Sequence, residues 1–197
     1  MLIPFIDIES TGLNPQKDWL LEVGVSVVDM PSGEEVFADS ALIYYPPKLL
    51  LAKREECDPY VRDMHDRGGL WADLQVRENT VDRDKLDSWL CTIGQLWSPD
   101  KPPIANFNAP FDRNWLSEYA PEFVAACLNH RCFDLSSARE MVRLMYPGGF
   151  GTQSGAGKHR ALDDAREAVV YWKWFRAHVM TPYGRNAGVA GSEGLCP

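Results

Sequence analysis

The sequence predicts a mixed α/β fold, in which a β-sheet with antiparallel and parallel strands is flanked by α-helices. Three apolar segments, at 2–8, 19–29 and 35–45, follow one another with short connections, which is typical of an antiparallel meander. After residue 80, stretches with apolar residues at helical spacing alternate with short apolar runs. A chain of 197 residues can bury a full hydrophobic core, and we expect one domain over residues 1–180.

The first predicted strand, 2–8, leads into two acids and a turn. Side chains alternate along a strand, so Asp7 and Glu9 share one face and lie about 6.6 Å apart. Residues 10–15, Ser-Thr-Gly-Leu-Asn-Pro, predict a turn after them. Two neighbouring acids cost stability unless a positive charge compensates them. The alternative is a solvent-facing pair on an edge strand, which Pro4 favours because proline suits strand starts and edges.

The middle of the chain predicts a change from strands to helices. A Pro-Ser-Gly turn at 31–33 separates the second strand from the third. Segment 49–74 has a mixed pattern and predicts short helices and loops. Apolar residues recur at helical spacing over 81–97, which predicts one helix there.

The following segment alternates short strands with helices. A short buried strand is expected at 104–107, followed by helices at 109–119 and 121–128. Another short strand is expected at 132–135, and Ser136 is the expected N-cap of the helix after it.

The last part of the chain predicts one long helix between two irregular segments. A glycine-rich loop is expected at 147–157, followed by the helix at 160–180. Residues 181–197 are rich in Gly and Ala without periodicity, which predicts a disordered C-terminal tail.

Composition excludes several classes of protein. Apolar residues make up 45% of the chain and charged residues 24%, as in ordinary water-soluble domains. Neither an apolar run of membrane-spanning length nor a signal peptide is visible, so we expect no membrane partner. Five cysteines without CxxC spacing favour reduced thiols and a cytoplasmic location. A net charge of −8 is unfavourable for coating duplex DNA, although it is compatible with an enzyme that holds a few phosphates through metal ions.

Three further residues become candidates from their positions. On the last helix, at about 100° per residue, Asp164 lies within about 70° of the centre of the apolar face, whereas Asp163 points away. An inward-facing acid needs a partner, and a metal ion is a suitable one. His159 shares no helical face with Asp164 and is expected on the preceding loop, where a lone histidine is more often structural than catalytic. Asp112 stands in the first turn of a helix, where it could simply compensate the helix dipole.

Each of these signals is weak alone, but together they suggest a metal site. They comprise Asp-x-Glu on a strand, an aspartate on a mid-chain helix, and His-x4-Asp at the start of the last helix. Hard cations such as Mg²⁺ and Mn²⁺ prefer carboxylate oxygens as ligands. Two-metal sites stabilise the attacking and leaving oxygens of phosphoryl transfer.

From about residue 5 to residue 179, the chain resembles the DEDDh 3′→5′ exonucleases, and within them the oligoribonuclease family. The resemblance is carried by five separate pieces in the family's order. They are DIESTGLNP at 7–15 with Asp18 and Glu22, His65 with Gly69-Leu70, Asp112-Arg113, the Arg131…Asp134-x-Ser136 segment, and HRALDDARE at 159–167. One such match would be weak, whereas five in order are highly specific.

The resemblance implies a ribonuclease H-like fold and a two-metal phosphodiester hydrolase. Asp7, Glu9, Asp112 and Asp164 would hold two divalent ions, Mg²⁺ or Mn²⁺, and His159 would be the general base. The implied substrate is short single-stranded RNA, possibly DNA, cut from the 3′ end to release 5′-mononucleotides. A homodimer is implied as well.

The resemblance also implies residues that bind the substrate, each with a structural alternative. Leu13 and His65 would contact bases at the scissile 3′ end; the alternatives are a hydrophobe folded into the core and a satisfied loop histidine. Arg131 and Ser136 would bind the phosphate at the other end; the alternatives are a surface ion pair and a helix cap. Asn108 stands where the family has a serine that helps bind the terminal phosphate.

Three departures from the oligoribonuclease pattern put a strict preference for very short RNA in doubt. NAPFD at 108–112 is closer to proofreading exonucleases. Tyr60 stands where tryptophan is usual, and His130 where tyrosine is usual. One alternative is therefore a broader DNA/RNA exonuclease or proofreading module. A separate alternative is an inactive nucleic-acid-binding domain on the same fold.

Overall fold

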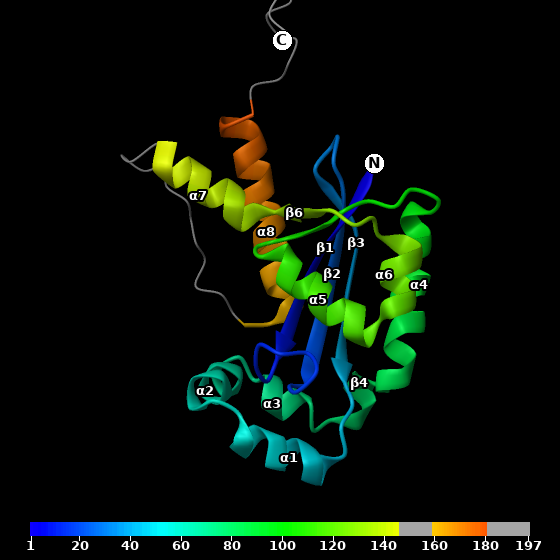
Figure 1. Cartoon of the computed structure of the whole chain (residues 1–197), viewed down its shortest axis with the longest axis vertical. Helices are drawn as coiled ribbons and strands as arrows, with labels where there is room; N and C mark the ends of the chain where they lie inside the picture. The colour runs from blue at the N-terminus through cyan, green and yellow to red at the C-terminus, as the bar shows by residue number, and fades with distance from the viewer. Residues whose placement is uncertain (146–158, 181–197) are drawn as a thin grey trace, which may run out of the picture.

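A mixed six-stranded sheet forms the centre of the molecule, which a computed structural model describes for residues 1–145 and 159–180 (Figure 1). The strand order is β4-β3-β2-β1-β5-β6. The strands are β1 Leu2–Ser10, β2 Leu20–Asp29, β3 Glu34–Ile43, β4 Thr80–Val81, β5 Ile104–Asn106 and β6 Cys132–Asp134. The first three form the predicted antiparallel meander, whereas β4, β5 and β6 each pair parallel to their neighbours. The predicted mixed α/β fold is therefore confirmed.

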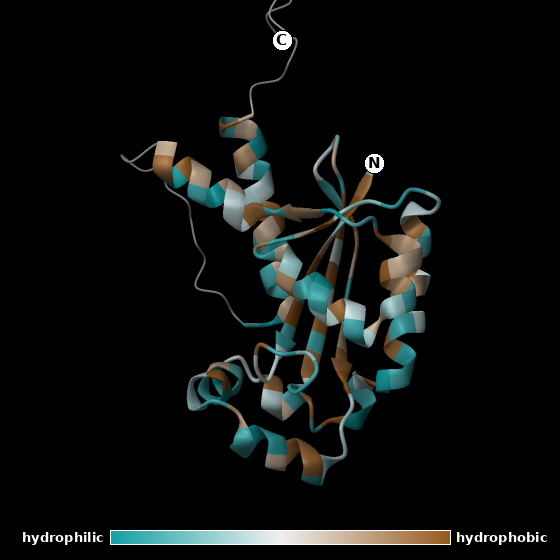
Figure 2. Cartoon of the chain, viewed as in Figure 1, coloured by the Kyte–Doolittle hydropathy of each residue, from teal (hydrophilic) through white to brown (hydrophobic). Residues whose placement is uncertain are grey.

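Strand β1 lies in the middle of the sheet, between β2 and β5. Its side chains alternate between two hydrophobic clusters: Ile3 and Phe5 belong to one, and Ile6 and Ile8 to the other. Figure 2 shows the strands of the meander as largely hydrophobic and the surrounding helices as mixed in character. Because β1 is central, the alternative of an acid pair on an edge strand is wrong.

Helices cover both faces of the sheet. α8, Ala161–His178, packs against β1 and β2 and buries the cluster that contains Ile3 and Phe5. On the other face, α5, Ala109–Tyr119, packs on β1, and α6, Pro121–Cys127, packs on α4, Leu86–Gly94. Each of these helices exposes its polar side and buries its apolar side, as an amphipathic surface helix does.

A smaller helical region lies beyond the C-terminal end of β1 (Figure 1). It consists of α1 Pro47–Glu56, α2 Pro59–Arg67 and α3 Leu70–Asp73. Helix α7, Leu135–Met145, follows β6 directly, and 3₁₀ turns occupy Arg77–Asn79, Arg83–Lys85 and Gln95–Trp97. The predicted mixture of short helices and loops over 49–74 is thus confirmed.

Two local predictions were wrong. The helix expected over 81–97 begins only at Leu86, because Val81 pairs with β3 in the short strand β4. Ser136 is not the N-cap of α7: Asp134 caps it, accepting hydrogen bonds from the Ser136 N–H at 3.0 Å and the Ser137 hydroxyl at 2.7 Å. The predicted loop at 147–157 and tail at 181–197 lie outside the described residues.

None of the described helices is apolar over a length that would cross a bilayer. The four described cysteines, Cys57, Cys91, Cys127 and Cys132, are free thiols.

Candidate active site

The acids of β1 lie where the strand ends, beside the first turn of α5. Glu9 is only 6% exposed and Asp112 only 3%. Asp112 Oδ1 accepts a hydrogen bond from the Ile8 N–H at 3.2 Å, which ties the start of α5 to β1. The structure therefore brings Asp112 next to Asp7 and Glu9, although it lies over one hundred positions after them in the sequence.

Asn106, the last residue of β5, lies between two of these acids and is not among the residues that the sequence predicts. Its Nδ2 donates to Asp7 Oδ1 at 2.7 Å and to Asp112 Oδ2 at 3.3 Å. The side chain is 1% exposed, and its Oδ1 has no hydrogen-bond partner among the described residues. An amide N–H₂ carries two hydrogens, so it can donate to two carboxylates at once without bringing a charge of its own. A polar residue that ends a short buried strand was the signal that could have identified it.

The start of α8 brings the last two predicted residues to the same place. Ligating atoms of Glu9, His159 and Asp164 all lie within 4.8 Å of one another, and this group contains Asp164 rather than Asp163. The helix start lies directly on β2 at Gly24, where an added Cβ would collide with the backbone of Ala161 and Leu162. His159 has a φ of 53°, a left-handed conformation that non-glycine residues rarely adopt and that is frequent at functional sites.

The electrostatics of this group are unfavourable for the protein alone. Burial, followed by repulsion from Asp7, Asp164 and other acids, raises the pKa of Glu9 to about 9. Burial and repulsion from Asp164 raise the pKa of Asp7 well above its usual range, although the Asn106 hydrogen bond opposes this. Burial and repulsion from Asp7 raise the pKa of Asp112 in the same way. Buried carboxylates this close together need positive charge to stay ionised.

The residues present fit a divalent cation. They offer carboxylate oxygens and, in Asn106, a buried amide oxygen without a partner among the described residues, which are the oxygen donors that hard cations take; the imidazole of His159 lies beside them. Among the described residues, the group of Glu9, His159 and Asp164 is the cluster whose ligating atoms lie close enough to share an ion.

His65 lies under this site rather than at its surface. Its side chain is fully buried, and its Nε2–H donates to the Ser10 carbonyl oxygen at 2.9 Å. Burial lowers the pKa of His65, so its imidazole is neutral at pH 7 and the 3.7 Å approach of Nδ1 to Glu9 Oε2 is no ion pair. In this structure His65 supports the end of β1 and presents no surface to a base.

Leu13, in contrast, lies at the edge of an apolar groove beside the acids. It is 83% exposed, so the alternative of a hydrophobe folded into the core is wrong. The Asp18 side chain folds over Gly12, leaving no room for a Cβ there, and accepts the Asn14 N–H at 3.0 Å, which shapes the turn that presents Leu13. The groove measures about 530 Å³. Its lining residues are Ile8, Glu9, Ser10, Gly12, Leu13, Asp58, Tyr60, Val61, Met64 and Phe111.

Of the other predicted substrate residues, the structure brings two into contact. The Asn108 N–H donates to Ser136 Oγ at 3.0 Å and to Asp134 Oδ1 at 2.9 Å. Asn108 has a φ of 58° and its side chain is exposed. Arg131 is exposed just before β6. Asn108 and Ser136 thus lie together at the N-terminal end of α5, beside the end of β6, whereas Arg131 precedes the start of β6.

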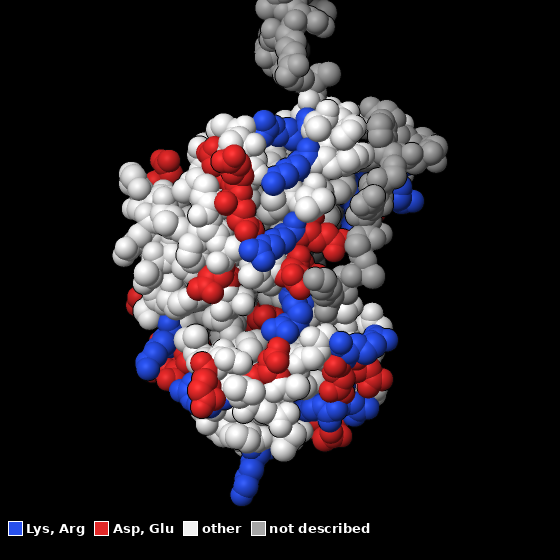
Figure 3. Space-filling model, turned by 180° about the vertical axis from the view of Figure 1, so that it is seen from behind, with Lys and Arg blue, Asp and Glu red and all other residues white. Residues whose placement is uncertain are grey.

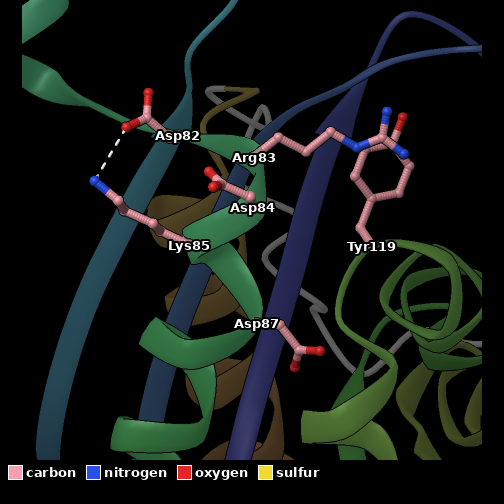
Figure 4. Close-up of a pocket in the computed structure, with 6 residues that line it drawn as sticks. All are labelled: Asp82, Arg83, Asp84, Lys85, Asp87 and Tyr119. Carbon is pink, nitrogen blue, oxygen red and sulfur yellow. Dashed lines mark ion pairs between the residues drawn. The ribbon is translucent and has the colours of Figure 1, made fainter.

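A second hollow, of about 720 Å³, has a different character (Figure 4). Arg83 stacks on the Tyr119 ring at 4.3 Å, and Lys85 pairs with Asp82 at 3.3 Å. The charges in it neutralise one another near the surface, without the buried acids of the first site. Figure 3 likewise shows acidic and basic side chains interspersed over the opposite face, with no continuous basic surface.

The fold and the first site define a class of protein. Buried and partly buried carboxylates from three distant segments, with a histidine, at the end of a central strand of a mixed sheet are suited to metal-assisted hydrolysis of phosphodiesters.

Comparisons with known proteins agree with this class. An oligoribonuclease from Vibrio cholerae is 31% identical over 178 residues, covering 89% of this chain and 93% of the relative. One from Baumannia cicadellinicola is 29% identical over 89% of this chain and 92% of the relative. No protein-family model matches the chain. The chain belongs to the oligoribonuclease family.

Solved structures with a similar fold include E. coli exonuclease I bound to a dT13 oligonucleotide, with a TM-score of 0.64 at 16% identity. The match covers 90% of this chain and 41% of that chain, so this protein spans about two fifths of exonuclease I. The same E. coli enzyme with single-stranded DNA is also known in a zinc-bound form. At this identity the likeness shows the fold alone, a ribonuclease H-like one.

Proposed function

We propose that this protein is a 3′→5′ exonuclease that hydrolyses short single-stranded oligonucleotides, RNA in the first place, to 5′-mononucleotides. The observation that carries the proposal is the meeting of Glu9, His159 and Asp164 within 4.8 Å, next to Asp7 and Asp112. These residues come from β1, α5 and α8, and membership of the oligoribonuclease family supports the same activity.

We assign roles by the chemistry of each side chain. Asp7, Glu9, Asp112 and Asp164 would hold two divalent cations, Mg²⁺ or Mn²⁺, and we count all four as catalytic together with His159. Bound there, such ions supply Lewis-acid stabilisation of the negative charge that develops on the phosphoryl oxygens. His159, half-buried on the loop before α8, accepts the proton of the attacking water. His159 has a left-handed backbone, and its ring nitrogen lies within 4.8 Å of the carboxylates of Glu9 and Asp164.

The apolar groove would hold the bases at the 3′ end of the substrate. Leu13 and Tyr60 are exposed at 83% and 67%, and Phe111 lines the groove beside them. Aromatic side chains bind single-stranded nucleic acid by stacking, which tolerates every base. Asn108 and Ser136 would bind a phosphate, with Arg131 at the other end of the substrate.

Two features favour a second candidate, a broader DNA/RNA exonuclease or proofreading-type module. Exonuclease I, which shares the fold, is known in complex with a DNA oligonucleotide. Asn108 and Phe111 in the NAPFD segment are the residues typical of proofreading enzymes. An inactive binding domain is disfavoured, because the acids and the histidine are all present.

We further propose a homodimer in the cytoplasm. Exposed apolar side chains on α7 support it, since Met141, Leu144 and Met145 are 56%, 69% and 70% exposed, and Figure 2 shows this outward face of α7 as partly hydrophobic. Light scattering after size exclusion should give twice the chain mass of 22.2 kDa. A mass of one chain would contradict the dimer without touching the nuclease proposal.

Product analysis tests the activity. A 5′-labelled RNA dinucleotide and 20-mers of RNA and DNA are incubated with Mn²⁺ or with EDTA. Rapid cleavage of the dinucleotide with a slow 20-mer supports the first candidate, and equal ladders on both 20-mers support the second. Asp7→Asn should remove the activity while the fold is kept. Metal-dependent activity that survives Asp7→Asn would contradict the site.

A further inference from the structure

Arg160 stands between His159 and the first residue of α8 and joins three elements. Its Nε and Nη2 donate to the two carboxylate oxygens of Glu22, on β2, at 3.1 and 3.2 Å. Its Nη1 donates to Asp73 Oδ2, at the end of α3, at 2.7 Å. A guanidinium has this fixed fork of donors, and a bidentate pair fixes direction as well as distance.

Glu22 holds the start of α8 from below. It is 2% exposed, and the same Oε2 that faces Arg160 also accepts the Ala161 N–H at 3.1 Å. A buried carboxylate must be paired and hydrogen-bonded, because an unpaired charge in this position is strongly unfavourable. The pair with Arg160 therefore fixes the start of α8 on the sheet. Gly24 of β2 has no Cβ, which allows the backbone of Ala161 and Leu162 to approach the strand closely.

This arrangement constrains His159 from its C-terminal side. The residue after it is fixed through its side chain, and the next through its N–H. The backbone of His159 itself is left-handed, a conformation that persists only where neighbouring contacts determine it. The Asp73 contact extends the same restraint to the helical region that carries Tyr60 and Met64, which line the groove.

We propose that Arg160 is a positioning residue: through Glu22 and Asp73 it places His159 against the acids and couples that placement to the wall of the substrate groove. The inference rests on the proposed function, in which His159 is the general base. All three guanidinium nitrogens of Arg160 are engaged by Glu22 and Asp73. Its effect reaches the reaction through the position of His159, so it belongs to kcat rather than to substrate binding.

The same helix offers a matched control. Arg166 makes a bidentate pair with Glu35 on β3, its Nε at 2.9 Å and its Nη2 at 2.8 Å from the carboxylate oxygens. Both pairs join α8 to the sheet with the same groups, but the Arg166 pair is more exposed and lies farther along the helix from His159. A purely structural contribution would appear in both pairs.

The experiment compares Arg160→Lys and Arg166→Lys in kcat, KM and melting temperature, with an RNA dinucleotide and Mn²⁺. Lysine keeps the charge beside Glu22 but cannot span Glu22 and Asp73 together. Asp73→Asn is the second variant, which weakens one arm and leaves the Glu22 pair. Arg160→Lys and Asp73→Asn are repeated in a His159→Ala background, because a residue that acts through His159 has nothing further to contribute once His159 is gone.

Arg160→Lys should lower kcat about tenfold to a hundredfold, since a displacement of about 1 Å is worth up to about 10²-fold, with KM within about twofold. Asp73→Asn should give a smaller loss of kcat, and Arg166→Lys should give none. In the His159→Ala background, Arg160→Lys and Asp73→Asn should cause no further loss of kcat. Equal losses in Arg160→Lys and Arg166→Lys, or the same loss with and without His159, would overturn the proposal. Full activity of His159→Ala would instead overturn the general base, and the inference with it.

Discussion

The site is built from two regions that differ in almost every physical respect. The acids belong to β1, α5 and α8. Glu9 and Asp112 are buried, Asp7 and Asp164 are partly buried, and the Asn106 amide links Asp7 to Asp112. The groove lies mainly between the loop after β1 and α2, with the exposed Leu13 and Tyr60 at its edges, and it meets the acids at Glu9. A buried polar network tolerates almost no change, whereas exposed apolar residues can be exchanged with little effect on the fold. Outside Glu9, which belongs to both, chemistry and substrate choice are therefore carried by different residues.

The largest expected effect distinguishes two adjacent acids on α8, of which only Asp164 belongs to the acid region. Asp164→Asn should lower kcat by at least about 10³-fold, because cations at the site supply several kcal/mol of transition-state stabilisation. Asp163→Asn, one residue earlier, should stay close to the wild type. Hydrolysis of a labelled dinucleotide in Mn²⁺, with circular dichroism as the folding control, measures both. A large loss in Asp163→Asn with an active Asp164→Asn would reverse the assignment.

His159→Ala should lower kcat by about 10²–10⁴-fold, the usual contribution of a positioned general base. KM should change little, since the bases are held in the groove. His178→Ala, at the exposed far end of α8, is the control. If His159→Ala affected KM alone, the histidine would belong to the substrate region instead.

Asn106→Ala should weaken Mn²⁺ binding by about 10–100-fold, the usual effect of removing a hydrogen bond that orients metal ligands. The amide donates to Asp7 and Asp112, and without it their mutual repulsion increases. Calorimetric titration of the metal-free protein measures this directly. Unchanged Mn²⁺ affinity would mean that the acids need no orientation from β5.

On the groove side, Tyr60→Ala should raise KM for a dinucleotide about fivefold or more, with kcat unchanged, because stacking on a base is worth roughly 1–3 kcal/mol. Tyr60→Phe keeps the ring and should behave as the wild type. A fall in kcat in either variant would show that the two regions are not separable.

The smallest effect concerns the stability of the metal-free protein. The folded-state pKa of Glu9, about 9, lies above the ordinary value of 4.5, so between these values the folded state holds a proton that the unfolded chain releases. Stability is therefore present at low pH and lost as pH rises toward about 9. Glu9→Gln should flatten this dependence and raise the melting temperature at pH 8 by a few degrees, at about 2–4 °C per kcal/mol for a chain of this size.

Differential scanning calorimetry in EDTA, from pH 5 to pH 9, tests this prediction. Added Mn²⁺ should reverse the trend in the wild type and have little effect in Glu9→Gln. A wild-type melting temperature that rises over this range in EDTA would contradict the raised pKa.

Local patterns in the sequence predict the elements well where apolar runs are long. The meander and α8 follow from such runs, but β4 does not, since two residues at Thr80 become a strand only by pairing with β3. Ser136 has the composition of a cap, yet Asp134 reaches the same backbone groups with a charged acceptor. The strand depends on a neighbour that is distant in sequence, whereas the cap is a local choice between two polar residues two positions apart, both of which suit an N-cap.

The candidate site shows the same division. The angle of Asp164 on α8 can be worked out from the sequence, because helical periodicity is local. The burial of His65 and the bridging position of Asn106 cannot, since each depends on β1 meeting a segment more than fifty positions away. Acids are candidates for a metal site by their residue type alone, whereas the neutral amide of Asn106 becomes a candidate only from its position between them.

The distribution of the site along the chain has a consequence for biosynthesis. Ribosomes make β1 with Asp7 and Glu9 first and α8 with His159 and Asp164 more than a hundred residues later. A nascent polypeptide that has not yet released α8 from the ribosome therefore lacks two of the three residues that meet at the cluster of Glu9, His159 and Asp164.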